Sequence, residues 1–164
     1  MPTALVIGTD HAFQRHQDFS KENRAVRNAF AESLQREVHE KGIDGIAEEA
    51  GDDREVWEHL RAQDAAIPEE WRALFSGTEV VDAPQPTIAR SFAEVAGITY
   101  ADVRAIGADR MTVAERDEAM AQATAERFIN RQSILIIVGE EHGGEMARIL
   151  QEKYGWTTES RRFP

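Results

Sequence analysis

Two histidines follow short apolar runs at the same spacing. ALVIGTDH places His11 three residues after Gly8, and ILIIVGEEH places His142 three residues after Gly139. An imidazole with an ordinary pKa of about 6.5 is a competent general base, and it is also a common ligand for divalent metals. The repeated spacing therefore predicts one site that uses both imidazoles, either for acid–base chemistry or for metal binding.

Two neighbouring carboxylates follow a third apolar stretch, within KGIDGIAEEA. Glu48 or Glu49 could complete a metal site with the histidines, and the expected metal ligands are His11, His142 and Glu48. Without a metal, the same carboxylate could fix the tautomer of a histidine and raise its basicity. The spacing leaves both possibilities open, as well as the choice between the two glutamates.

Two glycines come directly after the second histidine. Gly143 and Gly144 are expected to begin the last helix, whose first backbone N–H groups have no partner within the helix. Such groups bind anions, and they could stabilise the negative charge that develops on a substrate oxygen. Gly143 and Gly144 are therefore candidate oxyanion-binding residues.

Arg116 is the cation with the most unusual expected setting. It borders the stripe from Val113 to Met120 that its helix should bury, where an unpaired guanidinium would be costly. It could form a salt bridge with Glu115 or Asp117 on the same helix. It could instead point into the site and hold a carboxylate or a substrate oxygen, which makes it a candidate catalytic residue.

Alternating strand and helix patterns should position these residues. Expected strands cover 4–7, 43–47, 79–81 and 134–138; expected helices cover about 20–42, 54–63, 69–75, 87–96, 112–130 and 144–154. This order predicts an α/β fold, a central and largely parallel sheet flanked by helices, in a single compact domain over residues 1–164. The ligand crevice of such a sheet lies beyond the carboxyl ends of its strands, where both histidines fall.

Composition narrows the function classes. The 164 residues carry a net charge of −11, which opposes binding to nucleic acid or to anionic lipid. Cysteine is absent, so disulfides and thiolate chemistry are excluded. The longest apolar run, 134–138, is far too short to span a membrane. These features predict a soluble, cytoplasmic protein.

Taken together, the motifs resemble the TIKI/TraB superfamily, whose relatives include erythromycin-esterase-like and ChaN-like proteins. The resemblance rests on GTDH, AEE, ERDEAM and ILIIVGEEHGGEMARIL in this order, and it spans residues 4 to about 156. Two Gly-x-x-His motifs, a glutamate and an arginine mark that family. Carried over, they correspond here to His11, His142, Glu48 or Glu49, and Arg116.

The resemblance implies a hydrolase-like pocket. Members are associated with peptide cleavage that depends on a divalent metal such as Mn²⁺, Co²⁺ or Zn²⁺, with ester hydrolysis, or with haem binding. On this resemblance, the chain is expected to be shorter than members of the family and to lack the membrane anchor that several of them carry. A lid over the pocket is therefore expected to be missing, with a homodimer as one way to supply it.

The leading expectation is a small cytoplasmic hydrolase of peptide, amide or ester bonds, which acts on a small-molecule or peptide substrate. One alternative is a protein that binds haem or a small anionic ligand in the same crevice, which a Soret band would reveal. Another is a lyase or isomerase, because histidines and an arginine also support non-hydrolytic acid–base chemistry.

Overall fold

A parallel sheet forms the centre of the computed structural model, which describes residues 1–14, 21–50 and 87–164. In these ranges five strands run in the order β3-β2-β4-β1-β5, and every neighbouring pair is parallel. The strands are β1 (Thr3–Thr9), β2 (Gly45–Glu48), β3 (Thr99–Asp102), β4 (Ser133–Gly139) and β5 (Thr157–Phe163). The predicted α/β fold with a largely parallel sheet is confirmed.

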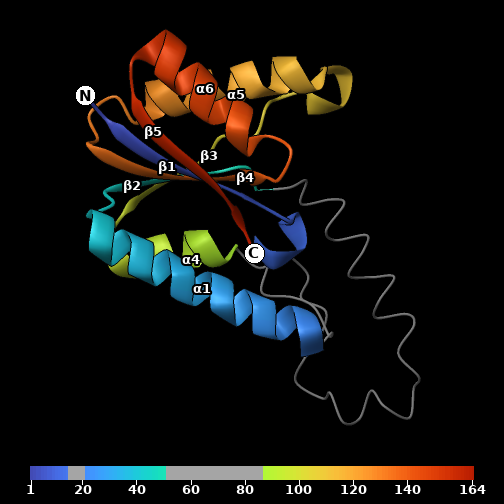
Figure 1. Ribbon diagram of the computed structural model, residues 1–164, viewed down its shortest axis with the longest axis vertical. Helices are drawn as coiled ribbons and strands as arrows, with labels where there is room; N and C mark the ends of the chain where they lie inside the picture. Colours follow the sequence, from blue (N-terminus) through green and yellow to red (C-terminus); the bar gives the residue numbers. More distant parts are fainter. Residues whose placement is uncertain (15–20, 51–86) are drawn as a thin grey trace.

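Helices cover both faces of the sheet (Figure 1). On one face lie α1 (Lys21–Lys41) and α4 (Ile88–Ala96), and on the other lie α5 (Val113–Arg127) and α6 (Gly143–Tyr154). Two short 3-10 helices, η1 (His11–Gln14) and η3 (Ala108–Arg110), follow β1 and β3. Successive side chains of the central strands point to opposite faces, so each face has its own apolar cluster.

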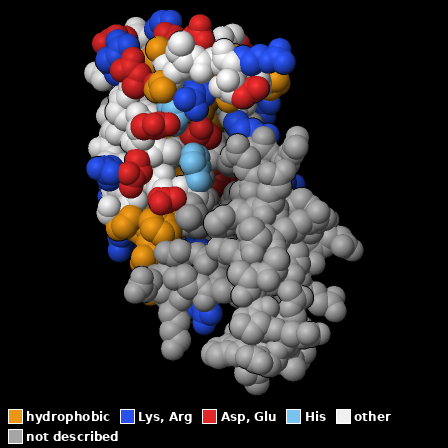
Figure 2. Space-filling model, turned by 90° about the vertical axis from the view of Figure 1, so that its right-hand side faces the viewer, with side chains coloured by type: hydrophobic (Ala, Val, Ile, Leu, Met, Phe, Trp, Pro, Cys, Tyr) orange, Lys and Arg blue, Asp and Glu red, His pale blue; other side chains and the backbone are white. Residues whose placement is uncertain are grey.

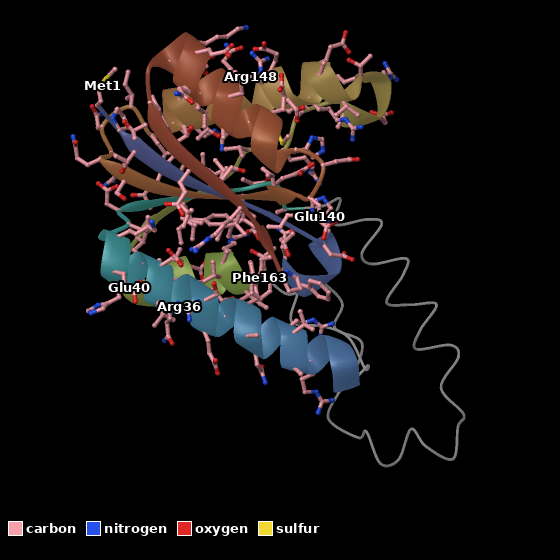
Figure 3. The ribbon with its side chains drawn as sticks, viewed as in Figure 1. Met1, Arg36, Glu40, Glu140, Arg148 and Phe163 are labelled. Atoms are coloured by element: carbon pink, nitrogen blue, oxygen red, sulfur yellow. The ribbon has the colours of Figure 1, made fainter. Side chains whose placement is uncertain are left out.

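The chain leaves β1 and β4 toward opposite faces of the sheet. These strands are neighbours, yet β1 leads through η1 into α1, and β4 leads directly into α6 on the other face. Such a divergence opens a crevice between the carboxyl ends of the two strands. Figure 3 labels Glu140 at this end of the sheet and Met1 at the opposite end.

Several expected boundaries are confirmed by helix caps. The Thr112 hydroxyl accepts from the Glu115 N–H at 3.2 Å, and the Glu115 carboxylate accepts from the Thr112 N–H at 2.8 Å, which completes a capping box at the start of α5. The Thr87 hydroxyl caps the start of α4 with a single hydrogen bond, which it accepts from the N–H of Arg90. The strand expected at 79–81 and the helices expected at 54–63 and 69–75 lie outside the described residues.

The sequence pattern missed β3 and β5. Most of β5, with the sequence TTESRRF, is exposed, because the strand lies at the edge of the sheet and has little apolar surface to bury. β3 is the opposite edge and has only four residues. In the described part of the chain, no helix has the length and apolarity needed to cross a membrane.

Candidate functional site

Three segments meet at the carboxyl end of β4. The Glu49 carboxylate lies between two imidazoles: its Oε2 is 3.7 Å from Nε2 of His11, and its Oε1 is 3.8 Å from Nε2 of His142. The backbone N–H of Gly139 donates a hydrogen bond of 3.0 Å to the same carboxylate and holds it in place. The structure therefore brings both predicted histidines together with Glu49.

The two motif glycines make room for each other's segments. A Cβ on Gly139 would lie 3.0 Å from Nε2 of His11 and 3.3 Å from Cδ2 of His142. A Cβ on Gly8 would lie 3.2 Å from the Cα of Glu140. Neither glycine has a positive φ, and both belong to regular strands, so a sharp turn out of the sheet is not the reason for them. Close approach of the two segments is the reason.

His142 is held by a buried carboxylate from α5. Its Nδ1 lies 2.5 Å from Oδ1 of Asp117, and both residues are almost fully buried. Burial raises the pKa of Asp117, and the hydrogen bond from His142 opposes that rise. Because a carboxylate only accepts, Nδ1 carries the hydrogen and Nε2 faces Glu49. The sequence had suggested Asp117 only as a salt-bridge partner for Arg116.

His11 is held by an amide instead. Its Nδ1 lies 2.5 Å from Oε1 of Gln14, a buried residue at the end of η1. The Gln14 amide nitrogen donates to Oε1 of Glu48 at 2.8 Å and to the backbone carbonyl of Glu49 at 3.1 Å. Gln14 thus connects His11 to the end of β2, a contact that the sequence pattern gave no reason to expect.

Glu48 faces away from the imidazoles. Its carboxylate is fully buried, and it accepts from the hydroxyls of Thr87 and Tyr100 at 2.5 and 2.6 Å as well as from Gln14. The expected metal ligands His11, His142 and Glu48 are therefore not assembled. In the described ranges, no group of three or more His, Asp or Glu side chains could hold a metal ion. These residues do not fit the metal that the resemblance implies.

An open hollow lies beside His11 at the edge of the sheet. Its volume is about 500 Å³, and it is lined by Thr9, Asp10, His11, Gly139, Glu140, Glu141 and Arg162. Figure 2 shows histidine side chains among acidic and basic ones on this side of the molecule. The guanidinium of Arg162 pairs with Glu140, and Glu141 reaches within 3.3 Å of Nε2 of His142. A molecule in the hollow would meet one imidazole directly and mainly acidic neighbours.

The remaining candidates lie apart from this cluster. Gly143 is buried against the backbone of Gly8, and neither it nor the exposed Gly144 lines the hollow. The expected oxyanion-binding amides are thus not part of the hollow's wall.

Arg116 differs from its expected setting. It is half-buried, its Nε has no hydrogen-bond partner, and its side chain makes no ion pair within the described residues. The buried face of its helix also differs from the expected stripe between Val113 and Met120. Val113 is 43% exposed, and Asp117 lies on the buried face. Among the described residues, Arg116 has no carboxylate partner of the kind that the sequence predicted.

Comparisons with known proteins give no relative: no family model matches the chain, and no curated protein or solved structure matches it.

Proposed function

We propose that this chain is a hydrolase of ester or amide bonds that works by acid–base chemistry. The proposal rests on one observation. Two imidazoles have their Nδ1 atoms held by Gln14 and Asp117, and their Nε2 atoms face opposite oxygens of the Glu49 carboxylate. Hydrolysis needs a group that takes a proton from water and returns it to the leaving group, and charges that stabilise the intermediate states.

His11 is the proton carrier in this proposal. It lines the hollow, its side chain is 45% exposed, and its Nε2 is available as an acceptor. A water molecule in the hollow gives a proton to Nε2 while its oxygen attacks the substrate carbonyl carbon. The resulting imidazolium then donates that proton to the leaving alcohol or amine as the bond to carbon breaks.

Glu49, His142 and Asp117 supply the charge environment. Glu49 faces Nε2 of His11 and so stabilises the imidazolium that forms there. The buried carboxylates of Glu49 and Asp117 would be costly without a partner, and His142 lies between them with one ring nitrogen toward each. His142 therefore acts on the reaction through Glu49.

In this proposal, Arg162 stabilises the negative charge that develops on the substrate oxygen. Its guanidinium is a permanent charge in the wall of the hollow, where it also holds Glu140. A negative charge that grows on the carbonyl oxygen during attack would be stabilised by such a donor. This assignment replaces the role expected for Gly143 and Gly144.

A turnover assay with p-nitrophenyl esters and short peptide amides tests the proposal. The wild-type protein should hydrolyse at least one class in the presence of a chelator, and His11→Ala should abolish the reaction. His39→Ala is the matched control, because His39 is exposed in the last turn of α1 and does not line the hollow. That variant should retain the wild-type rate.

Two results would count against this reading. Turnover that appears only after Mn²⁺, Co²⁺ or Zn²⁺ is added would replace it with a metal-dependent one. Absence of turnover combined with a Soret band on adding haem would favour the binding protein. The relationship to the TIKI/TraB superfamily agrees with a hydrolase and stays a prediction.

A further inference from the structure

Gln14 has a fixed orientation. Its side-chain nitrogen lies near two oxygens, Oε1 of Glu48 and the backbone carbonyl of Glu49. A backbone carbonyl can only accept, so the amide hydrogens of Gln14 must face this side. The amide oxygen of Gln14 is consequently the atom that faces Nδ1 of His11, at 2.5 Å.

The directions of the hydrogen bonds from the Thr87 and Tyr100 hydroxyls to Glu48 are also fixed. Thr87 Oγ1 accepts from the N–H of Arg90 at 3.2 Å, which leaves its hydroxyl hydrogen for Oε2 of Glu48. Burial, together with the negative charge of Glu48, raises the pKa of Tyr100 far above its ordinary value, so the phenol keeps its proton. Thr87 and Tyr100 therefore both donate to Glu48, which matches an ionised carboxylate that also accepts from Gln14.

We propose that Gln14, anchored by Glu48, is a positioning residue that keeps the hydrogen of neutral His11 on Nδ1 and leaves Nε2 free as the proton acceptor. The donor and acceptor directions of these hydrogen bonds permit only this tautomer of neutral His11. An oxygen of Gln14 faces Nδ1, so Nδ1 must donate, and a neutral imidazole carries one N–H. The inference rests on the proposed function for its catalytic meaning, although the tautomer itself can be measured without any substrate.

Nitrogen-15 NMR of the histidine rings tests the tautomer in the wild-type protein. At about pH 8.5, where imidazoles of ordinary pKa are neutral, long-range proton–nitrogen correlations distinguish Nδ1–H from Nε2–H. Comparison with the spectrum of His11→Ala assigns the signals. We expect Nδ1–H at His11, and an Nε2–H signal or an equal mixture of tautomers would overturn the proposal without any further variant.

Gln14→Leu should allow the His11 ring to adopt either tautomer. The Nδ1–H signal of His11 should be replaced by a mixture of tautomers, and kcat should fall about 10- to 100-fold, as is usual when an outer-shell partner is lost. Gln122→Leu is the control, since Gln122 is an exposed glutamine of α5 bonded only to Glu126 among the described residues. It should leave both measurements unchanged.

Gln14→Glu separates positioning from simple packing, because it keeps the shape of the side chain. The new carboxyl would lie against Glu48, and two close carboxylates raise the pKa of one of them. While it holds a proton, it can donate to Glu48 and still accept from His11. The rate relative to wild type should therefore fall as the pH rises, and a ratio independent of pH would argue for packing alone.

The two proposals fail in different ways. Nδ1–H at His11 with no hydrolysis of any ester or amide would remove the proposed function and keep the positioning role of Gln14. Hydrolysis that requires His11, together with an Nε2–H ring, would keep the function and remove the role of Gln14.

Discussion

The two Gly-x-x-His segments share a spacing but hold their imidazoles by different partners. Nδ1 of His142 meets the Asp117 carboxylate, and the His142 side chain is 1% exposed. Nδ1 of His11 meets the Gln14 amide, and that side chain is 45% exposed. A carboxylate partner stabilises a positive ring, whereas an amide fixes its orientation without adding charge. The buried imidazole is suited to orienting Glu49, and the accessible one to moving a proton.

Alanine variants of the two histidines give the sharpest test of this contrast. His11→Ala should lower kcat/KM at least about 100-fold, the usual scale for a lost general base, with little change in Tm. His142→Ala should lower it less, about 10- to 100-fold, because His142 acts through Glu49. It should also reduce the free energy of unfolding by about 1–3 kcal/mol, since Asp117 loses its buried partner.

Steady-state kinetics and thermal unfolding of both variants measure these differences. Equal losses of activity and of stability in the two variants would show that the motifs are equivalent. The shared Gly-x-x-His spacing alone would suggest the same effect on Tm for both alanine changes. The burial of His142 and its bond to Asp117 change that expectation for one of the two.

Asp117→Asn should change activity and stability in opposite directions. We expect kcat/KM to fall about tenfold, because an asparagine holds Nδ1 of His142 less firmly than a carboxylate does. In the folded protein the pKa of Asp117 is raised by burial, so its ionisation is disfavoured relative to the unfolded chain. Stability must then fall as the pH rises from the ordinary value of about 4 through the raised pKa.

The asparagine variant lacks this pH-dependent loss. Its Tm should be close to the wild-type Tm below about pH 4 and should exceed it increasingly toward neutral pH. Unfolding curves of the two proteins across this pH range are the measurement. A variant that is less stable than wild type at neutral pH would mean that the bond between Asp117 and His142 outweighs the cost of burial.

Sequence patterns found some parts of this site and missed others for physical reasons. His11 and His142 follow apolar runs that mark the carboxyl ends of parallel strands, so both could be located from the sequence, whereas the choice between Glu48 and Glu49 could not. Gln14 and Thr87 reach Glu48 from positions 34 and 39 residues away, and no local pattern encodes such contacts.

The buried role of Asp117 could have been recognised from the sequence. It lies three residues before Met120 and four before Ala121, both fully buried, so a charged residue stood on the core face of its helix. An acidic residue in that position needs a donor, and His142 provides one. The fold itself was predictable because the central strands are apolar on both faces, whereas the polar edge strand β5 carried no such pattern.

Gly139→Ala should have a moderate effect that reaches both histidines at once. Its Cβ would lie 3.0 Å from Nε2 of His11 and 3.3 Å from Cδ2 of His142, so the rings must move by a few tenths of an ångström. Misplacement on this scale should lower kcat/KM by up to about tenfold.

Gly144→Ala is the matched control for that variant. No atom lies within 4 Å of the position of its Cβ, so the rate should not change. Because alanine favours a helix over glycine, stability should increase by up to about 1 kcal/mol. If Gly144→Ala lowered the rate as much as Gly139→Ala, the start of α6 would belong to the site after all.

Arg116→Met should have the smallest effect, although the sequence made Arg116 a catalytic candidate. Its side chain makes no ion pair within the described residues, and it does not line the hollow. We expect kcat/KM to change by less than about threefold, as is usual for substitutions outside a packed or functional contact. Because a buried Nε without a partner is costly, its removal should leave Tm unchanged or raise it. Arg110→Met, at an exposed arginine of η3, supplies the control for loss of one positive charge. A loss of tenfold or more that is specific to Arg116→Met would assign the developing oxyanion to Arg116 rather than to Arg162.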